Sequence, residues 1–210
     1  MEKERIVKNA QKLSADVNSD QMLRRAFALL KVDKKNVKRK ILFLLLTGAW
    51  AWMLAKNEKT IELTATTVEL LNTVILAIFG ITFTGYSLFQ AMIGDDLLML
   101  LIEVGSTDDQ GASSKLEETN IYFIKVMLLQ FIIIVIDLIL RIFLNLISEE
   151  WGLLNSKALN EGICFIGLLA LLWLNMETVW EVKSFIFNIF QVCNLHDLSR
   201  ILDILKKDKW

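Results

Sequence analysis

The chain has 210 residues, of which 54% are hydrophobic, and it contains no proline. The apolar residues are concentrated in long runs, which indicates a membrane protein and excludes a single large soluble core. Two cysteines and one histidine are too few for a disulfide framework or for a histidine-rich metal cluster.

The net charge is only −1, but the charges are segregated along the chain. Residues 1–40 hold 12 Lys/Arg against 5 acidic residues, whereas residues 93–120 hold 7 acidic residues and the single Lys115. This segregation predicts a basic arm at the start of the chain and an acidic loop near its middle.

Residues 20–31 repeat apolar positions at helical spacing after Ser19, a plausible N-cap, and this predicts a short basic amphipathic helix. We expect the helix to lie on the inner leaflet, within a cytoplasmic arm over residues 1–40. The alternative is that the arm docks onto another protein. Five basic residues after the helix are expected to contact anionic lipid: Lys34, Lys35, Lys38, Arg39 and Lys40.

Four apolar runs predict an all-α, polytopic membrane protein with four transmembrane helices, at about 41–55, 71–93, 122–147 and 162–182. The first run is shorter than the roughly 20 residues that usually cross the hydrocarbon core. A buried core helix is the alternative there. Its basic flank and the aromatic pair Trp50 and Trp52 favour a span.

The distribution of Lys/Arg predicts the orientation. With the N-terminus inside, the cytoplasmic segments carry 17 Lys/Arg residues, and the outside loops carry only Lys56, Lys59 and Lys157. An even number of spans then places both termini in the cytoplasm. We therefore expect a multi-pass protein of the inner (plasma) membrane, with a four-helix transmembrane domain over residues 41–190 embedded in the lipid bilayer.

Two short helices are expected on the cytoplasmic side. Residues 95–103 predict an interfacial helix within an acidic loop over 94–120. Residues 191–210 continue the fourth helix into the cytoplasm with one apolar face. That face could pack against a sister subunit, the helix of the acidic loop or another protein.

The second span carries small residues along one helix face, continuing to Gly94. Helices in lipid associate through close backbone approach over such faces. The first span, with its shorter stripe of Gly48, Ala51 and Ala55, could pack there, or the face could form a subunit interface or line a pore. Because one short helix cannot cover the whole face, we also expect a homo-oligomer. The face consists of Thr73, Ala77, Gly80, Thr84, Ser87 and Ala91.

Charged residues inside the spans are costly and need partners. Asp137 and Arg141 are four residues apart, so they can pair on one helix face. In an antiparallel hairpin of the third and fourth spans, Lys125 would face Glu181 and Asp137 would lie level with Trp173. We expect these pairs to fix helix register. The alternative is an ion or proton pathway lined by Asp137, Gln130, Asn175 and Glu177.

No catalytic, cofactor-binding or metal-binding residues are expected. His196 is the single histidine, so the sequence offers no Ser-His or Cys-His set, and it has no glycine-rich phosphate loop. We therefore expect a protein that is not an enzyme, needs no cofactor and does not bind nucleic acid directly.

Two segments, FGITFTGYSLFQAMIGDDLL and KLEETNIYFIKVMLLQ, resemble small four-span membrane proteins that bacteria carry in anti-phage defence loci. Among these proteins, the two segments resemble the family of the Kiwa membrane subunit, KwaA. The resemblance covers these segments and the overall layout, and it carries over no site residues. It implies a homo-oligomer, specifically a tetramer, that monitors the envelope and works with a cytoplasmic partner acting on nucleic acid.

Two functions follow from these features. The first is an oligomeric inner-membrane sensor or scaffold that recruits or controls a cytoplasmic protein partner in anti-phage defence. The second is a small ion channel or a membrane-permeabilising effector.

Overall fold

The computed structural model describes residues 18–27, 30, 36–103, 115–148, 154 and 156–207, and all regular structure in these ranges is helical. Three helices are long and apolar enough to cross a membrane. The fold class is therefore confirmed as all-α with membrane-spanning character. The helices are α2 (Ser19–Phe27), α3 (Val37–Ala55), α4 (Thr60–Met92), α5 (Asp95–Glu103), α6 (Lys115–Leu146) and α7 (Lys157–Lys207).

The three candidate spans are α4, α6 and α7. α3 has 19 residues, but Lys38, Arg39 and Lys40 occupy its first turn, so its uncharged stretch is shorter than the roughly 20 apolar residues that usually cross the hydrocarbon core. A fourth span at α3 stays a prediction, as does the orientation of the termini.

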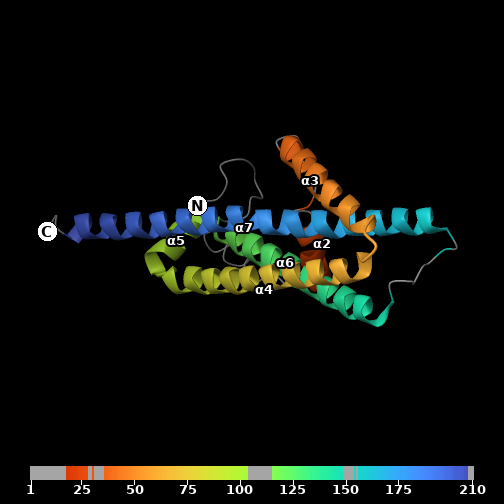
Figure 1. Ribbon diagram of the computed structural model, residues 1–210. Helices are drawn as coiled ribbons and strands as arrows, with labels where there is room; N and C mark the ends of the chain where they lie inside the picture. Colours follow the sequence, from red (N-terminus) through yellow and green to blue (C-terminus); the bar gives the residue numbers. More distant parts are fainter. Residues whose placement is uncertain are drawn as a thin grey trace.

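The long helices lie along one another, and α7 runs the length of the molecule (Figure 1). α4 and α7 point the same way and α6 runs against both, while α3 crosses α7 obliquely. Phe123 on α6 meets Phe185 on α7 with ring centroids 5.0 Å apart. Further along, Asp137 meets Asn175. The antiparallel hairpin of α6 and α7 therefore has close to the predicted register.

One end of the bundle is closed by aromatic and aliphatic packing. Phe123 lies between Phe89 of α4 and Phe185 of α7, and all three side chains are buried. Leu97 and Leu101 of α5 join the same cluster. α5 therefore covers the face of α7 that includes Val192. Of the three partners considered for the apolar face after the fourth span, the helix of the acidic loop is the one that packs on this part.

α2 packs against α6, and Ala26 is fully buried there. Leu30, just beyond α2, packs on a cluster that contains Ile75 and Leu129. The segment therefore contacts the bundle through Ala26 and Leu30, because two helices offer Leu30 an apolar surface. Its position on the inner leaflet stays a prediction.

Gly85 lies at a close approach of α4 to α7. A Cβ built at Gly85 would lie 2.5 Å from Ile189 Cδ1 and 2.9 Å from Phe185 Cε1. In contrast, a Cβ at Gly167 on α7 would meet nothing within 4 Å. The small side chain at position 85 is therefore a packing requirement.

Gly85→Ala is expected to lower thermal stability, by about 1–3 kcal/mol, because the added methyl overpacks the α4–α7 contact. The matched control is Gly167→Ala, which should leave stability unchanged or raise it. The measurement is thermal unfolding of the purified protein in detergent. Equal melting temperatures for the two variants would contradict the close approach.

Candidate functional site

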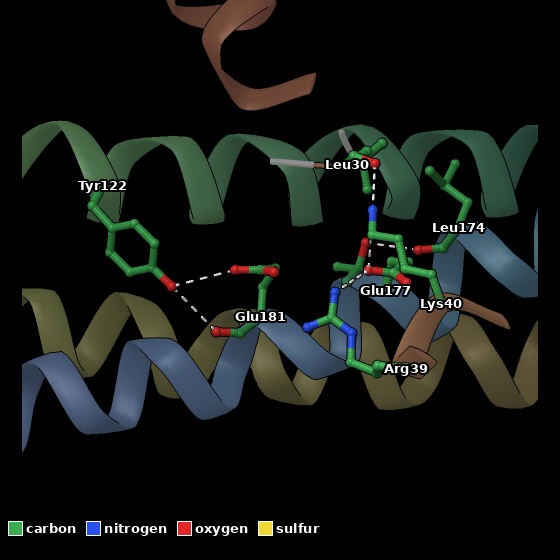
Figure 2. Close-up of polar contacts among 8 residues, drawn as sticks. Leu30, Arg39, Lys40, Tyr122, Leu174, Glu177 and Glu181 are labelled. Atoms are coloured by element: carbon green, nitrogen blue, oxygen red, sulfur yellow. Dashed lines mark hydrogen bonds and ion pairs between the residues drawn. The ribbon is translucent and has the colours of Figure 1, made fainter. Parts of the chain in front are cut away.

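Glu177 of α7 is the centre of a buried ion cluster. Its carboxylate oxygen Oε2 lies 2.9 Å from Arg39 Nη2 and 3.8 Å from Lys40 Nζ, both on α3. Figure 2 shows the Arg39 and Lys40 side chains converging on Glu177. Glu177 is 1% exposed and Lys40 is 6% exposed. Two cations from the start of α3 thus neutralise one acid in the middle of α7, and the cluster joins the two helices.

Aromatic rings surround the two cations. The Arg39 guanidinium lies 5.3 Å from the ring centroid of Trp180, and Lys40 Nζ lies 5.4 Å from that of Trp173. Phe43 meets Trp180 edge-to-face, with centroids 5.4 Å apart. Cations over ring faces gain electrostatic stabilisation that grows when water is excluded, so these rings add to the ion cluster.

Lys40 also contacts Leu30, which lies just beyond α2 in the chain. Its ammonium donates a hydrogen bond of 2.6 Å to the backbone carbonyl of Leu30 (Figure 2). The Lys40 side chain therefore joins Leu30 and Glu177 to the start of α3.

The predicted lipid contacts of the basic stretch need correction. Arg39 and Lys40 point into the bundle, because a buried carboxylate attracts them more strongly than a lipid head group in water would. Lys38 is exposed, as expected. Lys34 and Lys35 lie outside the described residues.

Asp137 and Arg141 do not pair with each other, so that prediction is wrong. Arg141 Nη2 lies 2.9 Å from Glu69 Oε1 on α4, while Asp137 accepts a 3.3 Å hydrogen bond from Asn175 Nδ2 on α7. Asp137 is fully buried, whereas Arg141 is 38% exposed. Adjacent turns of α6 thus face different helices, and each polar group finds its partner across a helix contact.

The predicted pair of Lys125 with Glu181 is also replaced. The Tyr122 hydroxyl lies within hydrogen-bond distance of Glu181, 3.5 Å from carboxylate oxygen Oε2 (Figure 2). Tyr122 lies about one turn before Lys125, the predicted partner of Glu181, so the predicted alignment of α6 with α7 is close to the observed one. The residue that faces α7 there is the tyrosine.

All four residues of the hypothesised polar pathway are buried: Gln130, Asp137, Asn175 and Glu177 are each at most 1% exposed. Each one bonds across a helix contact. Thr82 of α4 donates a 2.7 Å hydrogen bond to Gln130 Oε1, and Asn175 and Glu177 bond to α6 and α3. These contacts fasten helices to one another, which agrees with the register role expected of intramembrane polar residues.

The small-residue face of α4 is exposed along its whole length. The buried side of α4 carries Thr64, Val68, Ile75, Thr82 and Phe89, and the small residues occupy the opposite side. α3 does not cover them: its own stripe packs on α7, where Ala51 and Ala55 meet Leu168. Packing of the first two spans through this face is therefore wrong. Every member is exposed: Thr73, Ala77, Gly80, Thr84, Ser87, Ala91 and Gly94.

The hydroxyls on this face are satisfied within α4 itself. Thr73, Thr84 and Ser87 each donate to the carbonyl four residues earlier, at 2.9–3.0 Å. Polar groups bonded in this way tolerate contact with lipid or with the backbone of another helix.

Within the described part of the chain, no group of three or more metal-ligating side chains comes together. The two cysteines, Cys164 and Cys193, are not joined by a disulfide. The functional features of the described residues are therefore the ion cluster, the small-residue face and the extension of α7.

Sequence reasoning missed two partnerships, Glu177 with Arg39 and Glu69 with Arg141. A signal was present, because each glutamate lies within or beside an apolar run and needs a cation from another helix. Partner choice depends on the rotation of each helix about its axis, and hydropathy does not report that rotation.

Glu177→Gln is expected to lower the free energy of unfolding by about 3–5 kcal/mol, because the buried Lys40 and its neighbour Arg39 would both lose the carboxylate that they contact. The control is Glu62→Gln in the exposed pair with Lys59, where the expected change is small. Thermal unfolding in detergent measures both. A double-mutant cycle with Arg39→Leu should show coupling, and strict additivity would contradict the cluster.

Comparisons with known proteins give no family for this chain. No family model matches it, and neither a curated protein nor a solved structure is detectably similar to it.

Proposed function

We propose that the protein is an oligomeric inner-membrane sensor or scaffold that recruits or controls a cytoplasmic protein partner. The observation that carries the proposal is the length of α7 together with the apolar surface near its end. The resemblance of two segments to the Kiwa membrane subunit is our reason for proposing a role in bacterial anti-phage defence and a tetramer.

α7 has 51 residues, which corresponds to about 76 Å of helix. The hydrocarbon core of a bilayer takes up only about 30 Å of that length. In the proposed orientation, with α3 as a fourth span, the last part of α7 projects into the cytoplasm. Leu198, Ile201 and Ile204 lie near its end and are each at least 50% exposed.

These three side chains recur every three residues, so they share one side of the helix. α5 covers the apolar residues of α7 up to Leu195, and this surface begins just beyond it. A helix face with such anchors fits the groove of a soluble partner. We call Leu198, Ile201 and Ile204 the recruitment face.

The exposed small-residue face of α4 supports the oligomeric part of the proposal. It lies opposite the side that packs on α6, so a second copy can approach without disturbing the bundle. Small residues allow the close backbone contact by which helices associate in lipid.

A second candidate, a channel or permeabilising effector, is favoured by the burial of Gln130, Asp137, Asn175 and Glu177 within one bundle. Their hydrogen bonds across helix contacts favour the scaffold instead, because these groups are occupied in holding the helices together.

Changing the recruitment face to glutamine (Leu198→Gln, Ile201→Gln and Ile204→Gln together) is expected to reduce capture of the soluble partner by at least about tenfold, since each apolar anchor contributes to binding. The measurement is pull-down of the full-length protein from native membranes, with the partner identified by mass spectrometry. The control keeps the face apolar: Leu198→Ile, Ile201→Val and Ile204→Val.

Both triple variants would also be tested for protection of host cells against phage. Loss of protection in the glutamine variant alone supports recruitment in defence. Equal capture and equal protection for the two variants would contradict the proposal.

Ala77→Leu combined with Gly80→Leu is expected to shift the protein from oligomer to monomer, because two branched side chains block close backbone approach on α4. Native mass spectrometry of the detergent-solubilised protein measures the change. Ile81→Leu, an exposed position on another side of α4, is the control. An unchanged oligomer in the double variant would contradict the assignment of the face.

Ion flux decides between the two candidates. The purified protein in liposomes is expected to give no flux of potassium or protons above that of empty liposomes. If the wild-type protein does conduct ions, and if Glu177→Gln or Gln130→Leu changes the rate of that flux, the channel is favoured.

A further inference from the structure

Asp137 and Asn175 each leave one buried oxygen atom without a hydrogen bond to the described protein: Asp137 Oδ2 and Asn175 Oδ1. The two residues are already in contact, because Asn175 Nδ2 lies 3.3 Å from Asp137 Oδ1. They are 0% and 1% exposed. Burying two acceptor atoms without hydrogen bonds raises the free energy of the folded state considerably.

The donor capacity of Asn175 is used up. Its amide nitrogen carries two hydrogens, one directed to Asp137 and the other 3.1 Å from the carbonyl of Leu171. Its oxygen can only accept, and both oxygens of an ionised Asp137 can only accept. The two orphaned atoms therefore cannot satisfy each other while Asp137 is charged.

The neighbouring charged groups are engaged elsewhere. On α6 itself, Arg141 pairs with Glu69 of α4. Glu177 of α7 holds Arg39 and Lys40 of α3, and Glu181 interacts with Tyr122. Lys125 lies three turns away along α6. On α2, Asp20 and Arg24 are exposed, and Lys183 of α7 is exposed against Trp180.

A single proton on Asp137 removes the conflict. A carboxylic acid presents one donor and one acceptor, as a primary amide does, so the two planar groups can form two parallel hydrogen bonds. The acid O–H then donates to Asn175 Oδ1, while Asn175 Nδ2 continues to donate to the other acid oxygen. The end torsions of both side chains are soft enough to align them.

We propose that Asp137 is a proton-binding site: in the packed bundle it is a neutral acid that joins α6 to α7 through a two-bond contact with Asn175. The proton comes from water and returns to water when the contact opens. This assignment does not depend on the proposed function. In the sensor described above, water entering between α6 and α7 would ionise Asp137 and oppose their closure.

Infrared spectroscopy of the full-length protein in lipid nanodiscs at neutral pH tests the proposal. A carboxylic-acid carbonyl band above the amide I region is expected. Asp137→Asn should remove it, while Asp197→Asn, at an exposed position on α7, should keep it. Labelling aspartate carboxyls with carbon-13 shifts the band if it comes from an aspartic acid, and this readout needs no variant. A wild-type spectrum without a band that shifts on labelling would overturn the proposal.

The pH dependence of melting provides the second measurement. The bundle holds a proton that the unfolded chain releases at lower pH, so this contribution to stability is present in acid and is lost as the pH rises. The melting temperature of wild type minus that of Asp137→Asn should therefore fall with rising pH. A difference that rises with pH, or that increases on addition of sodium chloride, would show an ionised or cation-bound Asp137 and overturn the assignment.

Discussion

A glutamate buried against two cations from another helix holds this molecule together. Glu177 lies in the middle of α7, where water cannot neutralise it, and Arg39 and Lys40 at the start of α3 supply the charge. Removing the Glu177 carboxylate would take away the negative charge that both cations contact, and breaking a buried ion cluster in this way is strongly destabilising. The cluster therefore sets how α3 lies on α7, and Lys40 also holds the backbone carbonyl of Leu30.

The other intramembrane polar groups follow the same constraint. Asp137 with Asn175, Arg141 with Glu69 and Thr82 with Gln130 each join α6 to a neighbouring helix. Groups of this kind in lipid must find partners inside the protein. A bundle fastened in this way leaves one side of α4 exposed, together with Leu198, Ile201 and Ile204 near the end of α7.

The predicted helix ends agree with the structure to within a residue at three places. α3 ends at Ala55, α4 at Met92 and α6 at Leu146, against predicted ends at 55, 93 and 147. Hydropathy finds these ends because each apolar run stops where polar residues begin. The helix beginnings are earlier than predicted, since α4 and α6 start in polar turns that hydropathy does not register as part of a span. Partner choice among the charges was mostly wrong, because Arg141 and Asp137 face different helices.

By itself, the sequence determined the helical class, the positions of the apolar helices, the short helix α5 and four of the buried polar residues, Gln130, Asp137, Asn175 and Glu177. These follow from local composition and from the cost of placing polar groups in lipid. Only the tertiary structure decided that Arg39 and Lys40 turn inward, that α3 lies on α7 and that the small-residue face of α4 stays uncovered. Each of those outcomes depends on how a helix is rotated and on what approaches it, and close packing of whole side chains sets both.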